Sequence, residues 1–228
     1  MYYETSALDW RQTYKLLSST IVPRPIAWIV TTNEDGTPNA APFSFFNYFS
    51  GFPPVVCIGM TDRPTGPPDT FLNLQRTGEF VINLVPEELA EAMNVTAIEF
   101  PPGVNEIEAA RLRTVQSRIV QPPRIEGCPV ALECRLAQVL DVLGDKARIV
   151  VAHVLAIHVE DGALIDADRC YVDTSKLKLV GRMESPGCYV HTTDRFTMRT
   201  PTMDEWCAQA DIQAVQPACP QSSKKTFE

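Results

Sequence analysis

The sequence lacks the glycine-rich loops that bind nucleotide phosphates. It contains no G-x-G-x-x-G and no G-x-x-x-x-G-K motif, and the one comparable segment, DRPTGPPDT, has a single glycine and no lysine. The G-x-S-x-G turn of serine hydrolases is absent as well. These absences exclude nucleotide binding by such a loop and serine-hydrolase chemistry of that type.

Residues that ligate metals are also scarce. The chain has 3 histidines, and His153 and His158 are five apart in a predicted strand, which places them on opposite faces. The 7 cysteines are scattered, with no C-x-x-C pair, which predicts reduced thiols rather than a disulfide framework or a zinc site. Because no nucleophile is indicated either, a bound cofactor would have to carry any chemistry.

Basic clusters and long apolar runs are missing too. The net charge is −8, which disfavours nucleic acid and anionic membranes as partners. No apolar run approaches the ~18 residues of a membrane span, and the N-terminus lacks the pattern of a signal peptide. With 45% hydrophobic residues, the chain can form a sizeable core, and we expect a cytoplasmic globular protein.

What the sequence does contain is a series of β-branched apolar runs. Residues 26–32 and 39–46 flank a DG pair, which predicts a hairpin. Residues 55–60 predict a third strand, and 130–142 with 147–161 predict a long hairpin. Strands and helices do not alternate regularly, so the sequence predicts a mainly β, Greek-key barrel with short helical insertions.

The stretch NAAPFSFFN, residues 39–47, has small residues and two polar side chains among aromatic ones. Ala40 and Ala41 let a ligand approach the backbone, while Ser44 and Asn47 can donate hydrogen bonds without adding charge. This pattern suits a flat heteroaromatic ligand with a polar edge. A bulge in a crowded sheet is the alternative interpretation of the same pattern, with Pro42 marking an interrupted or edge strand.

Three further features fit such a ligand. A predicted helix begins at Asp69 or Thr70 and offers free amides to an anion, although the two residues are also ordinary helix caps. Arg24 carries a guanidinium that can hold a phosphate at two points. Trp28 has a large apolar face for stacking.

Several segments in order resemble the flavin reductase-like family, whose fold is the FMN-binding split barrel, in its flavoredoxin-type branch. They are VPRPIAWIVTTNEDGTPNAAPFSFFNYFSGFPPVV (22–56), DTFLNLQRTGEFVINLV (69–85), MNVTAIEFPPGVNE (93–106), PPRIEGCPVALECRL (122–136) and VGRMESPGCYV (180–190). The resemblance covers residues 1–201, which we predict to be one split-barrel domain. Residues 202–228 are predicted to be a poorly ordered C-terminal tail.

The resemblance implies FMN bound non-covalently at a homodimer interface. The residues that would contact it are Arg24, Pro25, Trp28, Thr31, Asn39, Ala41, Ser44, Phe45, Asn47, Asp69, Thr70, Asn73 and Arg182. No catalytic side chain and no metal are implied. Where relatives carry a basic residue before the aspartate of the D-T pair, this chain has Pro68, so either FMN binding is weaker or Arg63 replaces that charge. Losing one charge-assisted bond costs ~1.5–3 kcal/mol.

The implied function is an NAD(P)H-dependent flavin reductase, with NADH or NADPH as reductant. The acceptor would be oxygen, a partner monooxygenase, a metal or a small electrophile. Two alternatives remain open. One is an FMN electron carrier that does not use NAD(P)H directly, and the other is a split-barrel protein that has lost flavin and binds another planar ligand.

Overall fold

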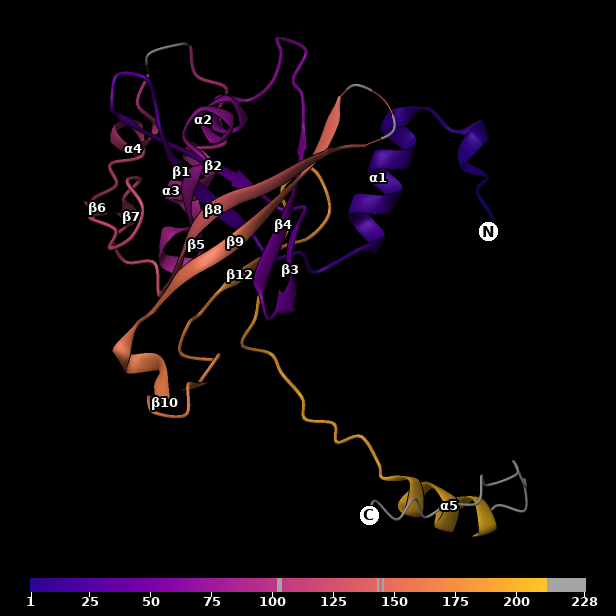
Figure 1. Cartoon of the computed structure of the whole chain (residues 1–228). Helices are drawn as coiled ribbons and strands as arrows, with labels where there is room; N and C mark the ends of the chain where they lie inside the picture. The colour runs from indigo at the N-terminus through magenta and orange to yellow at the C-terminus, as the bar shows by residue number, and fades with distance from the viewer. Residues whose placement is uncertain (102–103, 143, 145, 213–228) are drawn as a thin grey trace, which may run out of the picture. The chain divides into compact units, whose positions relative to one another are not determined.

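The computed structural model describes residues 1–101, 104–142, 144 and 146–212 (Figure 1). The chain divides into two units, Met1–Thr193 and Asp194–Glu228. The second unit contains the helix α5 (Met203–Ile212), which lies in the segment predicted to be a poorly ordered tail. Residues 213–228, the rest of that tail, lie outside the described residues.

The first unit is built on an antiparallel sheet of seven strands, in the order β2-β1-β5-β8-β9-β4-β3. Their bounds are β1 (Ala27–Thr32), β2 (Pro38–Phe43), β3 (Phe46–Gly51), β4 (Pro54–Thr61), β5 (Glu79–Leu84), β8 (Val130–Asp141) and β9 (Ala147–Val159). The predicted hairpins β1–β2 and β8–β9 are both present. The mainly β fold predicted from the sequence is therefore confirmed.

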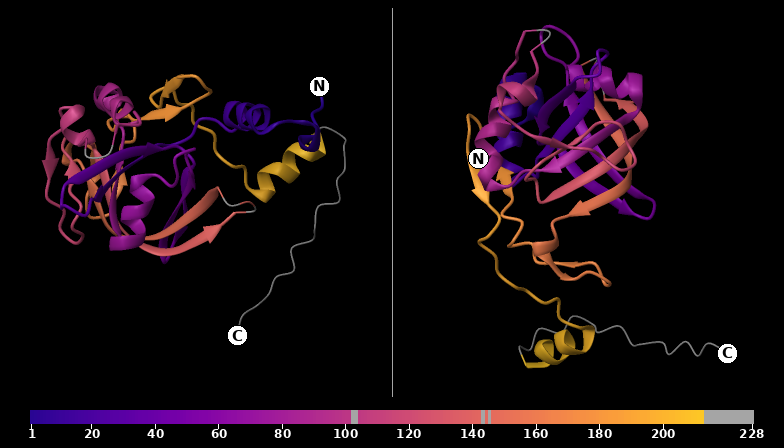
Figure 2. Two further views of the ribbon diagram at one scale, coloured as in Figure 1. Left: turned by 90° about the horizontal axis from the view of Figure 1, so that it is seen from above. Right: turned by 90° about the vertical axis from the view of Figure 1, so that its left-hand side faces the viewer.

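Short elements surround this sheet. The helices are η1 (Thr5–Ala7), α1 (Trp10–Thr20), α2 (Asp69–Thr77), η2 (Glu87–Leu89), α3 (Ala90–Val95), α4 (Glu106–Ala109) and η3 (Asp161–Ala163). The short strands are β6 (Thr114–Val115), β7 (Arg124–Ile125), β10 (Leu164–Asp166), β11 (Tyr171–Val172), β12 (Val180–Arg182) and β13 (Tyr189–His191). Figure 2 shows the sheet curling, with β8 and β9 as its long strands.

The connection between β2 and β3 explains why the sheet curls into a barrel. These strands occupy opposite edges of the sheet, yet only Ser44 and Phe45 separate them in the chain. The edges must therefore come close together, and the backbone N–H of Gly59 in β4 donates to the Phe45 carbonyl at 2.7 Å. A Cβ atom at Gly59 would lie 3.0 Å from the Phe45 Cβ, so a larger residue would force the two segments apart by a few tenths of an ångström.

The two faces of the β1–β2 hairpin belong to different cores. Ile29 packs with the barrel interior, which also contains Phe71, Phe80 and Ile82. Alternate residues face the other way, and Ala40 of β2 packs there in a second cluster with Trp28. Ala40 is fully buried, so its small size serves packing within the protein itself.

The cysteines differ from the prediction at one position. Cys57, Cys128, Cys134, Cys170 and Cys188 are free, as predicted. Cys207 in α5 is disulfide-bonded, so the prediction of reduced thiols is wrong there. Burial raises the pKa of the Cys128 thiol to about 12, which keeps it protonated.

Candidate functional site

A cavity of about 250 Å³ lies where β2 and β12 end. Its apolar walls come from Ile26, Pro42, Met93, Ala97 and Pro186, and its polar groups come from Tyr14, Ser44, Asn94, Arg182 and Tyr189. We call this cavity the Ser44–Arg182 cleft. Ser44 and Arg182 are two of the residues predicted from the sequence to contact a ligand.

Arg182 is the only basic residue among the lining residues of this cleft. Its guanidinium lies over the Tyr189 ring at 4.7 Å from the ring centroid. One long hydrogen bond joins its Nη2 to the Pro186 carbonyl at 3.4 Å, and among the described residues it forms no ion pair. Most of its donors are therefore available to a ligand.

Arg24 lies next to Arg182, but its guanidinium is held by hydrogen bonds within the protein. Its Nη1 donates to the carbonyls of Ser18 at 2.5 Å and Ile21 at 3.0 Å, and its Nη2 donates to the Met183 carbonyl at 2.8 Å. The backbones of Arg24 and Arg182 also pair, with N···O distances of 2.9 and 2.8 Å. Arg24 thus joins the end of α1 to β12, and its guanidinium does not offer the free two-point contact proposed for a phosphate.

Trp28 is also placed differently from the sequence-based expectation. Its ring is 0% exposed, and its Nε1 donates to the Thr96 hydroxyl at 2.9 Å. Because both faces are packed against core residues, no face is available for stacking on a ligand. A tryptophan in an apolar strand is more simply a core residue with one satisfied polar atom.

A second group of predicted residues meets at the start of α2. Asn39 donates from Nδ2 to the Thr31 hydroxyl at 3.3 Å and to the Thr70 hydroxyl at 3.1 Å. Asn73 donates to the Thr31 hydroxyl at 3.1 Å and to the Asn33 Oδ1 at 2.8 Å. These buried bonds fix the first turn of α2 against the hairpin β1–β2.

The cavity beside this polar group is acidic. It measures about 480 Å³, and its lining includes Asn39 together with the carboxylates of Glu34, Asp35, Asp69, Glu106 and Glu108, without a basic residue. Burial raises the pKa of Glu106, and the nearby Asp69 adds to the rise. Arg63, the candidate substitute for the missing charge at Pro68, is paired with Glu99 at 3.5 Å.

Both cavities follow the same strand. Pro42 and Ser44 line the Ser44–Arg182 cleft, while Thr37 and Asn39 line the acidic cavity. The facing walls come from one stretch of chain, with Met93 and Ala97 in the first cavity and residues 104–106 in the second. The two cavities thus lie along β2, one with an uncommitted cation and the other with carboxylates, and we refer to them together as the groove along β2.

Comparison with known proteins identifies the family to which this chain belongs. Residues 18–175 match the family described as "Flavin reductase like domain". The chain belongs to the flavin reductase-like family. An uncharacterised protein of Deinococcus radiodurans is 39% identical over 213 residues, covering 91% of this chain and 93% of the relative. The family assignment made from the sequence is confirmed.

Solved structures with the same fold include two proteins of related sequence. 2-Nitrobenzoate 2-nitroreductase of Pseudomonas fluorescens aligns with a TM-score of 0.81 and 31% identity, covering 89% of this chain and 97% of that protein. Nitrilotriacetate monooxygenase component B of Bacillus cereus aligns with a TM-score of 0.81 and 26% identity, covering 87% and 98%. The flavoredoxin of Desulfovibrio vulgaris, at 16% identity and a TM-score of 0.68, shares the split-barrel fold.

The remaining predicted residues of this flavin reductase-like chain are dispersed. Phe45 is 44% exposed, and the Tyr14 ring contacts it edge-on at 6.3 Å between centroids. Pro25 lines a neighbouring cavity of about 210 Å³. Ala41 lies in β2, while Asn47 lies in β3, where its Oδ1 accepts from the Tyr48 N–H. Asn47 lines neither cavity of the groove.

The sequence analysis missed Asn94 in the cleft and misplaced the two strand histidines. Asn94 lies in α3, and although it falls within the segment 93–106 quoted for the family resemblance, no motif around it marks a ligand contact. His153 pairs with Arg135 and His158 with Ala131, four positions apart in β8, so the histidines share one face of the sheet. A register shift in this pair adds one residue to β9, and this bulge reverses the expected alternation.

Proposed function

We propose that this protein is an FMN-binding oxidoreductase that reduces its flavin with NADH or NADPH. The observation that carries the proposal is the groove along β2, in which Ser44 and Arg182 keep donors free, in a chain of the flavin reductase-like family. When bound, FMN supplies two-electron chemistry between a reduced nicotinamide and an acceptor.

The Ser44–Arg182 cleft suits the flavin ring. Ser44 and Asn94 can donate to ring carbonyl oxygens, because neither side chain is saturated by its contacts within the protein. Arg182 places a positive charge where a reduced, anionic ring edge would be stabilised. The apolar walls formed by Ile26, Pro42 and Met93 exclude water from the ring.

Two opposing effects act on a phosphate at the other end of the groove. The first turn of α2 leaves the N–H groups of Asp69 and Thr70 without helical partners, and the helix dipole favours an anion there. The carboxylates of Asp69 and Glu106 oppose it. We propose that the phosphate binds at the start of α2 and that its affinity is limited by these charges.

Exposed aromatic residues support a homodimer. Tyr48 is 74% exposed, Phe49 67% and Phe52 97% on β3 and the turn after it, and Phe45 continues this apolar face toward α1. Such a face is typical of a protein interface. Replacing Phe49 with Ser would shift the mass measured by light scattering toward the monomer, whereas replacing the equally exposed Ile165 with Ser would not.

The acceptor is proposed from the relatives. One similar protein is a component of a nitrilotriacetate monooxygenase and another is a 2-nitrobenzoate 2-nitroreductase. Delivery of electrons to a partner monooxygenase or to a small electrophile therefore fits this chain. No helix in the described part of the chain is long and apolar enough to cross a membrane.

The first experiment is an absorbance spectrum of the purified protein incubated with FMN, followed by anaerobic addition of NADH and of NADPH. Flavin bands that bleach support the proposal. Bands that persist identify an electron carrier without direct nicotinamide use, and no binding of FMN or FAD contradicts a flavoprotein.

Two variants locate the flavin within the groove. Arg182→Gln is expected to weaken FMN and riboflavin alike, since its target is the ring. Asp69→Asn removes a carboxylate at the start of α2 and is expected to strengthen FMN but not riboflavin, because only FMN carries the phosphate. Equal effects of Asp69→Asn on both ligands would place the phosphate elsewhere.

A further inference from the structure

Another cavity, with two arginines in its walls, lies away from the groove, where β9 ends. It measures about 510 Å³ and is lined by Arg118, Arg124, His158 and Glu160, with the remaining wall from residues 127–129, 157 and 159. None of these residues lines the groove along β2. In a chain with a net charge of −8, two arginines on one cavity are an unusual concentration of positive charge.

Both guanidinium groups are uncommitted within the described part of the chain. Among the described residues, neither Arg118 nor Arg124 forms an ion pair or a side-chain hydrogen bond, and the buried Nε of Arg124 has no acceptor. A buried donor without an acceptor costs stability, so such a group is uncommon unless something binds to it. The remaining guanidinium N–H groups of Arg118 and Arg124, which line the cavity, therefore point to a ligand that supplies oxygen acceptors.

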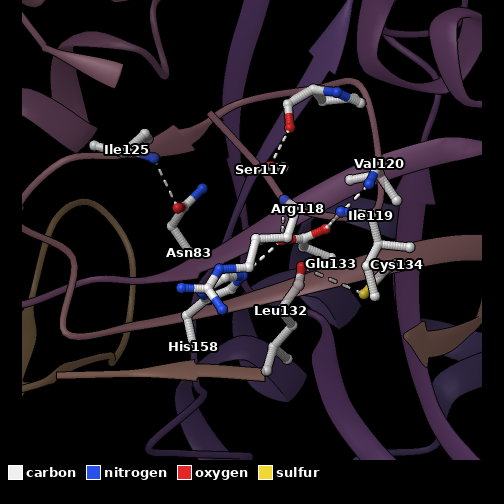
Figure 3. A network of polar contacts seen from close by, with 11 residues as sticks. Asn83, Ser117, Arg118, Ile119, Val120, Ile125, Leu132, Glu133, Cys134 and His158 are labelled. Carbon is white, nitrogen blue, oxygen red and sulfur yellow. Dashed lines mark hydrogen bonds and ion pairs between the residues drawn. The ribbon is translucent and has the colours of Figure 1, made fainter. Parts of the chain in front are cut away.

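Buried polar residues hold the segment that carries Arg118 in place. Glu133 of β8 is fully buried and accepts from the backbone N–H groups of Arg118, Ile119 and Val120 at 2.8, 2.6 and 3.0 Å (Figure 3). His158 lies on the other side of this carboxylate, with its Nε2 2.6 Å from the Glu133 Oε1. The loop beneath the cavity is thus fixed to the sheet.

The segment that carries Arg124 is anchored in the same way. Asn83 of β5 is fully buried, and its Oδ1 accepts from the Ile125 N–H at 2.9 Å (Figure 3). Its Nδ2 donates to the Trp28 carbonyl at 3.1 Å. The Ser117 hydroxyl donates to the Pro122 carbonyl at 2.5 Å and closes the loop between the two arginines. The backbones under both guanidinium groups are therefore held rigidly.

We infer that the Arg118–Arg124 cavity is a binding site for a small organic or inorganic oxyanion, a phosphate or a carboxylate, that is independent of the flavin site. Two guanidinium groups on fixed backbones provide the planar donors that such oxygens accept. With its Nε2 bound to Glu133, His158 can offer only Nδ1 to a ligand. Cys128 contributes a protonated thiol to the wall, so the cavity indicates binding rather than thiol chemistry.

Glu160 is the one carboxylate among the cavity's lining residues, since Glu133 is buried and paired with the loop N–H groups. Glu160 is exposed, and its charge opposes an anion in the cavity. Its removal should therefore tighten binding, whereas removal of an arginine should weaken it. Changes in anion affinity of opposite sign at neighbouring positions indicate a specific anion site, because a general effect on folding would weaken binding at every position.

The test is calorimetric titration of the purified full chain with inorganic phosphate and, separately, with benzoate, at low ionic strength. We expect one of the two to bind, and Arg118→Gln or Arg124→Gln to weaken it about tenfold each. Glu160→Gln should tighten binding about two- to threefold. Arg113→Gln, at an exposed arginine paired with Glu126 at 2.9 Å, is the matched control and should change little.

Phosphate and carboxylate accept hydrogen bonds from the same donors, so the probe that binds identifies the ligand class. Circular dichroism of each variant verifies that it is folded, and Glu160→Gln, at an exposed position, gives a result even if an arginine variant does not fold. The inference is overturned if neither anion binds, or if binding is unaffected by Arg124→Gln and by Glu160→Gln.

Discussion

The Glu133 region and the Ser44–Arg182 cleft both contain polar side chains in apolar surroundings, but they use their hydrogen bonds differently. Glu133 accepts from three backbone N–H groups and contacts His158, so its oxygens are fully occupied. Arg182 has one long hydrogen bond and a ring contact. The difference suggests that spare hydrogen-bonding capacity, rather than polarity, separates a ligand-binding residue from a structural one.

The largest effect expected from this comparison is on stability at Glu133. Glu133→Ala leaves three backbone N–H groups, of which that of Val120 is buried, and His158 without their acceptor, and we expect the free energy of unfolding to fall by about 3–5 kcal/mol. Urea unfolding followed by circular dichroism measures this. Glu126→Gln, at an exposed ion pair, should change stability by less than about 1 kcal/mol. A loss at Glu133 as small as that of the control would contradict a structural role.

Acid should produce a related loss in the unmodified protein. Burial alone would raise the pKa of Glu133, but the bonds from Arg118, His158, Ile119 and Val120 outweigh it and lower the pKa from 4.5 to about 2. Because the unfolded chain takes up the proton first, this contribution is complete above pH 4.5 and is lost as the pH falls toward 2, by about 3 kcal/mol. Unfolding measured between pH 6 and pH 2.5 should show this slope, and Glu133→Gln should flatten it.

A smaller and more selective difference is expected between the two neighbouring arginines. Arg24→Met removes three bonds to carbonyl groups and should lower stability by about 1.5–3 kcal/mol. Arg182→Met should change stability by less than about 1 kcal/mol but weaken flavin binding about tenfold. Thermal unfolding of both variants measures the change in stability, and flavin fluorescence titration measures the change in flavin affinity. A reversed pattern would mean that Arg24, not Arg182, contacts the ligand.

The smallest effect should come from Tyr189→Phe. The Tyr189 hydroxyl makes only a long contact of 3.5 Å with the Asn94 Oδ1, so stability should change by about 0.5 kcal/mol or less. If the hydroxyl instead donates to a bound flavin, affinity should fall by a few-fold. A large loss of stability together with unchanged flavin affinity would mean that the Tyr189 hydroxyl is used by the fold. It would contradict the idea that residues of the cleft keep hydrogen-bonding capacity for a ligand.

Much of the fold followed from local pattern. The DG pair between apolar runs predicted the β1–β2 hairpin, and Pro42 predicted an edge strand, which β2 is. The Asp69–Thr77 helix ends at Gly78, which has φ 70° as a helix-ending glycine should. These features depend on a few neighbouring residues, and the sequence displays them directly.

The groove residues were only partly predictable. Ser44 and Arg182, 138 positions apart in the printed sequence, share a cleft as the family resemblance implied, although no local pattern pairs them. The same reasoning assigned a ligand role to Trp28 and Arg24, whose contacts lie within the protein. Which of two similar side chains remains free depends on distant carbonyl and hydroxyl groups, which a sequence does not place.

By itself, the sequence determined the strand pattern, the family and the absence of nucleotide-binding glycine loops, because these depend on residue type and short spacing. Only the tertiary structure decided which polar groups are satisfied. It placed Glu133 under the loop of Arg118 and directed Arg24 to the end of α1, and it left Arg182, Arg118 and Arg124 without ion pairs among the described residues. The reason is that hydrogen-bond saturation is set by which distant backbone groups come within about 3 Å.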